Sequence, residues 1–196
     1  SLNPGIGCID PSQASALAVA LLAAKMWGLK KSQFFDVLGL AGFQAAGSFE
    51  IEGSGYWARR NLYGWLAVQG IHAALLARAG HVGPDNILEG PYGFLNQFSA
   101  KPDASVFDNL GSPWELPRTG AKRWMASRST HSAIEGVLRI CTDHDIQPEQ
   151  IEEITLESGS YIYSAKTLPE EYKRNPPTPR LGSLSLYWLA AATAIY

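Results

Sequence analysis

An almost entirely apolar run near the start of the chain restricts the fold more than any other feature. Residues Ala14 to Ala24 are rich in Ala and Leu, the strongest helix formers, and Ser12 just before them can cap a helix. The pattern predicts a helix from Ser12 to Leu29 that is apolar nearly all round, so it must be buried on more than one side. The run covers only about half a bilayer and ends at Lys25, which favours a core helix over a membrane span.

Two more helices are predicted after it, over Ser32 to Ala46 and over Trp57 to Ala79, each with apolar residues at helical spacing. The glycines of the first of these two indicate tight helix packing, because their spacing fits no phosphate-binding loop. The segment from Ala100 to Pro117 is polar and interrupted by proline, which is typical of a linker or surface loop. We therefore expect an all-helical domain over residues 1–115.

The sequence changes in character after this linker. A helix is predicted from Thr130 to Asp143, and Ile151 to Glu157 alternates in the manner of a strand. Leu168 to Gly182 holds four prolines and predicts a loop, whereas Ser183 to Tyr196 is apolar and predicts a last helix. The predicted fold class is mainly α, with a helical-bundle domain followed by a smaller α+β domain over residues 116–196.

The charge balance argues against nucleic acid as the default partner, because 16 Lys and Arg stand against 18 Asp and Glu. Two distant cysteines, Cys8 and Cys141, form no metal or redox motif, which favours a reducing compartment. No signal peptide or membrane span is predicted, so we expect a cytoplasmic protein, or a mitochondrial one in a eukaryote. The chain starts at Ser1 and ends within an apolar run at Tyr196, so we expect a fragment or trimmed chain.

The segment from Lys122 to His131 is the most informative for chemistry. It combines cations, hydroxyl groups and an imidazole just before a predicted helix. Helix N-termini present unpaired N–H groups and the positive end of the helix dipole, so this segment suits a carboxylate ligand. His131 could then serve as acid or base. A solvated basic loop before an ordinary first turn explains the same pattern, and both interpretations stay open.

A second cationic point, Arg59 and Arg60, lies at the head of the third predicted helix, where the dipole favours acids. It indicates either a ligand site or plain surface placement. Glu50 and Glu52 could neutralise these arginines, and a hydrolase with paired carboxylates also stays possible. The remaining histidines are interpreted as structural, and the sequence has no metal-ligand pattern and no nucleophile elbow.

Four segments also run in the order of one known family. They are Ala23–Gly42, Gly64–Leu95, Lys122–Glu135 and Ser185–Ala190. The set resembles the MmgE/PrpD family, which contains 2-methylcitrate dehydratase and cis-aconitate decarboxylase. The second segment is the strongest match, and the third is similar to the family's Lys-x(8)-His segment before a helix.

The resemblance implies a large helical domain, a smaller α+β lid domain and an active site in the cleft between them. It implies lyase or epimerase chemistry on small di- and tricarboxylic acids without a metal or organic cofactor. Lys122 and His131 match the family, whereas Asp10 stands in place of a His and Arg59 in place of a Lys. A nearby His of many members aligns with Leu62. In the family, helices before the first segment, which are absent from this sequence, normally supply an Asp and a His to the site.

We therefore expect a dehydratase or decarboxylase in which Arg59, Lys122 and Arg128 bind carboxylates. His131 or Lys122 would move a proton on the carbon next to a carboxylate, with Asp10 as a partner. The alternative is a non-catalytic member or one part of a split enzyme, serving as a binding or scaffold subunit. The first and third helices carry more apolar surface than one small core can cover, so a homodimer is expected as well.

Overall fold

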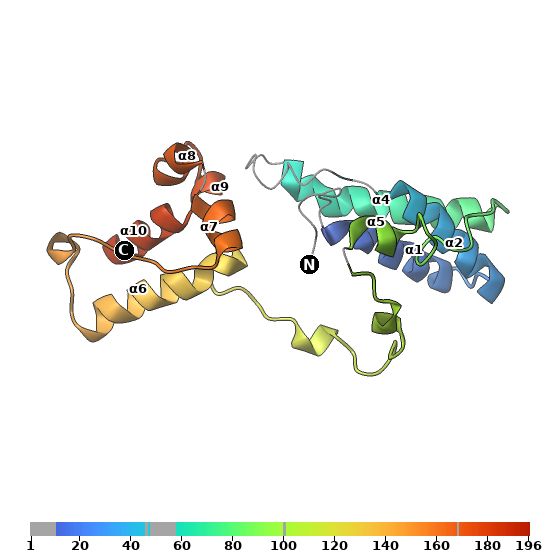
Figure 1. Ribbon diagram of the computed structural model, residues 1–196, viewed down its shortest axis with the longest axis horizontal. Helices are drawn as coiled ribbons and strands as arrows, with labels where there is room; N and C mark the ends of the chain where they lie inside the picture. Colours follow the sequence, from blue (N-terminus) through green and yellow to red (C-terminus); the bar gives the residue numbers. More distant parts are fainter. Residues whose placement is uncertain (1–10, 46, 48–57, 100, 168) are drawn as a thin grey trace. The chain divides into compact units, whose positions relative to one another are not determined.

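The structure is a computed structural model that describes residues 11–45, 47, 58–99, 101–167 and 169–196. The chain divides into two compact units, Ser1–Trp114 and Glu115–Tyr196. The helices described in the first unit are α1 (Ala14–Met26), α2 (Lys31–Gln44), α4 (Ala58–Arg78) and α5 (Phe94–Phe98) (Figure 1). Those of the second are α6 (His131–Asp143), α7 (Ser160–Thr167), α8 (Glu170–Arg174), α9 (Pro179–Gly182) and α10 (Leu186–Ile195). Short 3-10 turns occur at Pro11–Gln13, Ala104–Phe107, Leu116–Arg118, Arg128–Thr130 and Pro148–Gln150.

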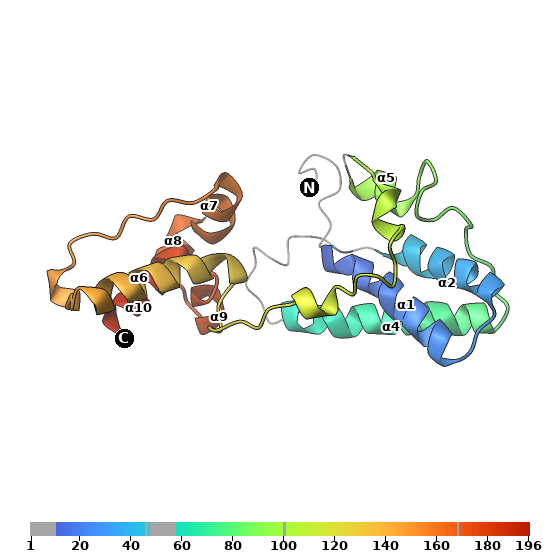
Figure 2. The ribbon, with the colours of Figure 1, turned by 90° about the horizontal axis from the view of Figure 1, so that it is seen from below.

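Helix α1 lies against both α2 and α4, which confirms the prediction that it is buried on more than one side (Figures 1 and 2). The buried residues among the three helices are mostly alanine: Leu17, Ala20, Ala23, Ala24, Val37, Leu40, Ala41, Ala73, Ala74 and Ala77. Such small side chains allow helix axes to approach closely. At Gly70 of α4 the backbones of α4 and α1 lie close together, because a Cβ there would lie 2.6 Å from the carbonyl oxygen of Ala16.

The turn after α4 closes onto α2. The backbone N–H of Gly83 donates to the Asp36 carboxylate at 3.2 Å. A Cβ on Gly39 of α2 would lie 2.6 Å from the backbone nitrogen of Pro84, so only glycine fits at this position. The expectation that the glycines of this helix serve tight packing is confirmed here.

Large apolar side chains are exposed on the side of α4 that faces away from α1 and α2. Trp65, Val68 and Leu75 are 64%, 55% and 45% exposed, and their spacing puts them on one stripe of the helix. Helix α1 likewise exposes Leu22 and Met26. None of the helices in the described ranges is long and apolar enough to cross a membrane.

In the second unit, α10 packs against α6 and α8. The fully buried Ser185 connects two of these helices, since its hydroxyl donates to the carbonyl of Lys173 and accepts from the N–H of Trp188 at 3.1 Å. It thereby caps α10, as serine commonly does at helix starts. The buried Lys173 ammonium donates to the carbonyl of Leu184 at 3.1 Å.

Two predictions for this unit are wrong. Ile151–Glu157 forms no strand, and no strand occurs elsewhere in the described part of the unit, so its α+β character is not seen. A strand needs a neighbour for its backbone hydrogen bonds, and this segment has none within the described residues. The predicted loop 168–182 contains α8 and α9, because Pro169 and Pro179 stand at the helix starts, where proline is tolerated.

Candidate functional site

The segment before α6 folds back on itself through local hydrogen bonds. The buried Thr130 closes the 3-10 turn Arg128–Thr130 by donating its hydroxyl to the carbonyl of Ser127 at 2.7 Å. The N–H of Ser127 donates to the carbonyl of Ser183 at 3.0 Å, which attaches the segment to the entry of α10. Helix α6 then begins at His131, with no acidic residue in its first turn. The positive end of its dipole is therefore not neutralised by a local side chain.

Two predicted anion-binding cations lie on this segment, and both are exposed. The ammonium of Lys122 donates to the carbonyl of Ala126 at 3.1 Å, and the guanidinium of Arg128 donates to the carbonyl of Gly120 at 3.2 Å. These bonds hold the cations close to the loop backbone, yet neither cation is neutralised by them. An anion at the start of α6 can therefore meet positive charge from the loop as well as from the helix end.

His131, the predicted acid or base, is half-buried at the first position of α6. Its ring packs against Trp124 at right angles, with the two ring centroids 5.2 Å apart and an interplanar angle of 84°. Its Nε2 atom is buried and has no hydrogen-bond partner among the described residues. A buried nitrogen without a hydrogen-bond partner is energetically costly, which makes His131 a candidate for a functional role.

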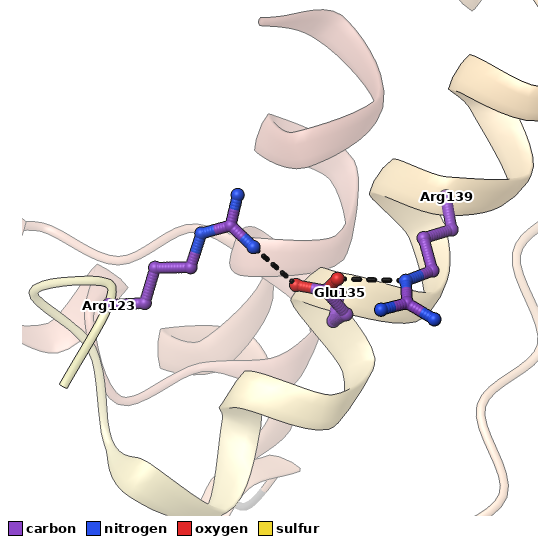
Figure 3. A network of polar contacts seen from close by, with 3 residues as sticks. All are labelled: Arg123, Glu135 and Arg139. Atoms are coloured by element: carbon purple, nitrogen blue, oxygen red, sulfur yellow. Dashed lines mark hydrogen bonds and ion pairs between the residues drawn. The ribbon is translucent and has the colours of Figure 1, made fainter. Parts of the chain in front are cut away.

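A polar network connects the same loop to α6 (Figure 3). Both oxygens of the Glu135 carboxylate are used, one by Arg123 at 3.0 Å and the other by Arg139 at 2.8 Å. The Arg123 guanidinium also lies over the Trp124 ring, 4.9 Å from its centroid. Sequence reasoning missed Trp124 and Glu135, because contacts that span 7 and 12 residues depend on the path of the loop.

For two further predicted site residues the structure describes no side chain. Asp10 lies outside the described residues, and so does the side chain of Arg59, whose backbone belongs to α4. The structure therefore shows Lys122, Arg128 and His131 on one segment. Among the described residues, no group of three or more His, Cys, Asp or Glu side chains could hold a metal ion.

Comparison with known proteins gives consistent matches. The model of the MmgE/PrpD N-terminal domain matches residues 3–106. The cis-aconitate decarboxylase-like protein oryM of Aspergillus oryzae is 26% identical over 194 residues, which are 91% of this chain and 39% of that protein. A cis-aconitate decarboxylase of Aspergillus terreus is 28% identical over 156 residues, 76% of this chain and 31% of the relative. A further Aspergillus terreus protein of that name is 30% identical over 130 residues, 62% and 26% of the two chains.

The chain thus spans less than half the length of these relatives. The family model covers more than half of the chain, and the resembling segments Ala23–Gly42 and Gly64–Leu95 lie within the matched residues. The chain belongs to the MmgE/PrpD family.

Proposed function

We propose that this chain is part of a lyase that acts on a small di- or tricarboxylic acid, as a dehydratase or a decarboxylase. The observation that carries the proposal is the cluster before α6: two exposed cations, a helix N-terminus without an acidic residue in its first turn, and a histidine whose buried Nε2 has no hydrogen-bond partner in the described part of the chain. Cis-aconitate decarboxylases among the relatives support the same class of substrate.

In this proposal the cations bind and the histidine moves the proton. Lys122, Arg128 and Arg59 bind carboxylate groups, since charge-assisted hydrogen bonds are the strong ones. His131 or Lys122 moves a proton on the carbon beside a carboxylate, removing it in dehydration and supplying it in decarboxylation, with Asp10 as partner. The cationic cluster stabilises the negative charge that develops on the carboxylate in the transition state.

Such a site could carry out either of two reactions, dehydration or decarboxylation. In dehydration, the electron pair of the broken C–H bond forms a C=C bond, and hydroxide leaves as water after taking up a proton. In decarboxylation, a C–C bond breaks and carbon dioxide leaves, while the remaining electron pair takes a proton at carbon. Both need only side-chain acids, bases and cations, and we propose no cofactor.

A second candidate is a non-catalytic binding subunit or one part of a split enzyme. It is favoured by the residues at two positions, Asp10 in place of a His and Arg59 in place of a Lys. Arginine keeps the positive charge but does not give up a proton near neutral pH, and Asp changes the acid and base groups present. Carboxylate binding would survive both changes, whereas proton transfer is more sensitive to them.

The deciding experiment uses the full-length protein with 2-methylcitrate, citrate and cis-aconitate, following the absorbance of unsaturated acids. His131→Ala should lower turnover by roughly 10²–10⁴-fold, as expected for loss of a general acid or base. Lys122→Ala should mainly weaken substrate binding, by about 1.5–3 kcal/mol. A folded protein that binds these acids by calorimetry without turning any of them over would establish the second candidate instead.

We also propose that the protein is a homodimer. The exposed stripe of Trp65, Val68 and Leu75 on α4 is a surface that a second copy could cover.

A further inference from the structure

The carboxylate of Glu135 on α6 forms ion pairs with two arginines from different segments. Arg123 comes from the loop and Arg139 from the next turn of the same helix, and each bonds a different oxygen of Glu135 (Figure 3). The two arginines are similarly exposed, 66% and 72%, whereas the Glu135 side chain is only 29% exposed. Within this network, the Arg123 pair alone connects the loop to the helix.

Arg123, the loop residue of this ion pair, is connected to His131 through Trp124. Arg123 lies over the ring of Trp124, and Trp124 packs edge-on against the imidazole of His131. Cation–π and edge-to-face contacts both depend on ring orientation. Because Arg123 and Trp124 are consecutive, fixing the Arg123 guanidinium on Glu135 also restricts where the Trp124 ring can lie.

We propose that Glu135 is a positioning residue, which through Arg123 and Trp124 holds the imidazole of His131 in one orientation. The inference rests on the proposed function, in which His131 transfers the proton. Among the described residues, the Glu135 carboxylate bonds Arg123 and Arg139 but not His131, so its effect on His131 is indirect. A ring held by packing on one side keeps its unpaired Nε2 aimed at one place, as efficient proton transfer requires.

The test compares Arg123→Ala with Arg139→Ala. Each variant removes one exposed arginine from the same carboxylate, and only the first removes an ion pair between the loop and α6. Exposed ion pairs contribute little to stability, so the two melting temperatures should agree. The first readout is NMR of the His131 ring protons, assigned with His131→Gln, whose shifts contain a ring-current contribution from Trp124.

Trp124→Leu gives the His131 shifts without that contribution. The proposal expects Arg123→Ala and Glu135→Ala to move the His131 shifts toward the Trp124→Leu values, while Arg139→Ala leaves them in place. Arg123→Lys, which keeps a cation for Glu135, should restore part of the shift. Equal shifts in the Arg123→Ala and Arg139→Ala proteins would overturn the proposal.

The second readout is turnover of whichever acid the parent protein converts. Arg123→Ala should lower kcat by roughly ten- to a hundredfold, as misplacing a reacting group does, with less change in KM, and Arg139→Ala should not. Displaced His131 shifts with unchanged kcat would refute the positioning role. If the parent converts none of the acids, the proposed function fails, and the NMR comparison alone still decides whether Glu135 positions His131.

Discussion

The contact between α1 and α4 predicts opposite outcomes for two glycines of the same helix. A Cβ at Gly70 would lie 2.6 Å from the carbonyl oxygen of Ala16 and 2.9 Å from both the Ala20 nitrogen and the Val19 Cβ. A Cβ at Gly64 would meet nothing within 4 Å. Gly70→Ala and Gly64→Ala thus add the same methyl group to the same helix, but only the methyl group at position 70 meets atoms of α1.

The expected magnitudes follow from these distances. Replacing Gly by Ala inside a helix stabilises it by about 0.8–1.0 kcal/mol, and Gly64→Ala should show this gain in full. At Gly70 the obstacle is mainly backbone of α1, which cannot rotate aside as a side chain can. Overpacking of that kind costs about 1–3 kcal/mol and offsets the gain. The free energies of unfolding of the two variants should therefore differ by about 1–3 kcal/mol, with Gly70→Ala the less stable.

Urea unfolding followed by circular dichroism measures this difference, and amide hydrogen exchange of α1 peptides shows whether the loss falls on that helix. Exchange in α6, in the other unit, serves as the internal control and should be the same in both variants. If Gly70→Ala is as stable as Gly64→Ala, the close approach of α1 and α4 is refuted, and with it the account of the alanine-rich core.

Three further outcomes are expected. Ser185→Ala removes a buried hydroxyl that bonds the Lys173 carbonyl and the Trp188 N–H, so thermal unfolding should show a loss of about 1–3 kcal/mol; a loss below about 0.5 kcal/mol, usual for surface sites, would contradict the cap. Hydrogen bonds from the Ser105 side chain and N–H hold the pKa of Asp103 below its ordinary 3.8, so their stabilising effect is present above that pH and is lost as pH falls through the lower native pKa. Ser105→Ala should raise the Asp103 titration midpoint in carbon-13 NMR, and an unchanged midpoint would disprove the cause given. Trp65→Glu should shift the protein toward monomer in light scattering, whereas a parent protein that is already monomeric at micromolar concentration would exclude the homodimer.

The long helices could be predicted from the sequence because their pattern is repeated over many residues. The third helix was predicted over residues 57–79, and α4 is described over Ala58–Arg78. The prediction of a strand at Ile151–Glu157 is wrong because alternation of apolar and polar residues indicates only that a segment has two different faces. A strand also needs a neighbouring strand for its backbone hydrogen bonds, which no local pattern reveals. The short helices α8 and α9 were missed because proline was read as a loop signal rather than as a helix start.

The candidate site was predictable in part for a similar reason. His131 at the start of α6 and the cations Lys122 and Arg128 are neighbours in sequence, so a local pattern identifies them. Trp124 reaches His131, and Arg123 reaches Glu135, only because the loop turns back on α6. Such a turn depends on the backbone path, which composition and spacing do not specify.

The alanine-rich core of the first unit has a thermodynamic consequence. Alanine loses no side-chain entropy on burial, so a core of this kind can be stable while it removes little apolar surface from water per residue. The heat capacity change of unfolding scales with the apolar surface exposed, and it is about 12–15 cal/mol/K per residue in ordinary globular proteins. For this unit it should be smaller, which makes the curve of stability against temperature flatter. The helices should then lose stability slowly on either side of the optimum temperature, over a broad range rather than a narrow one.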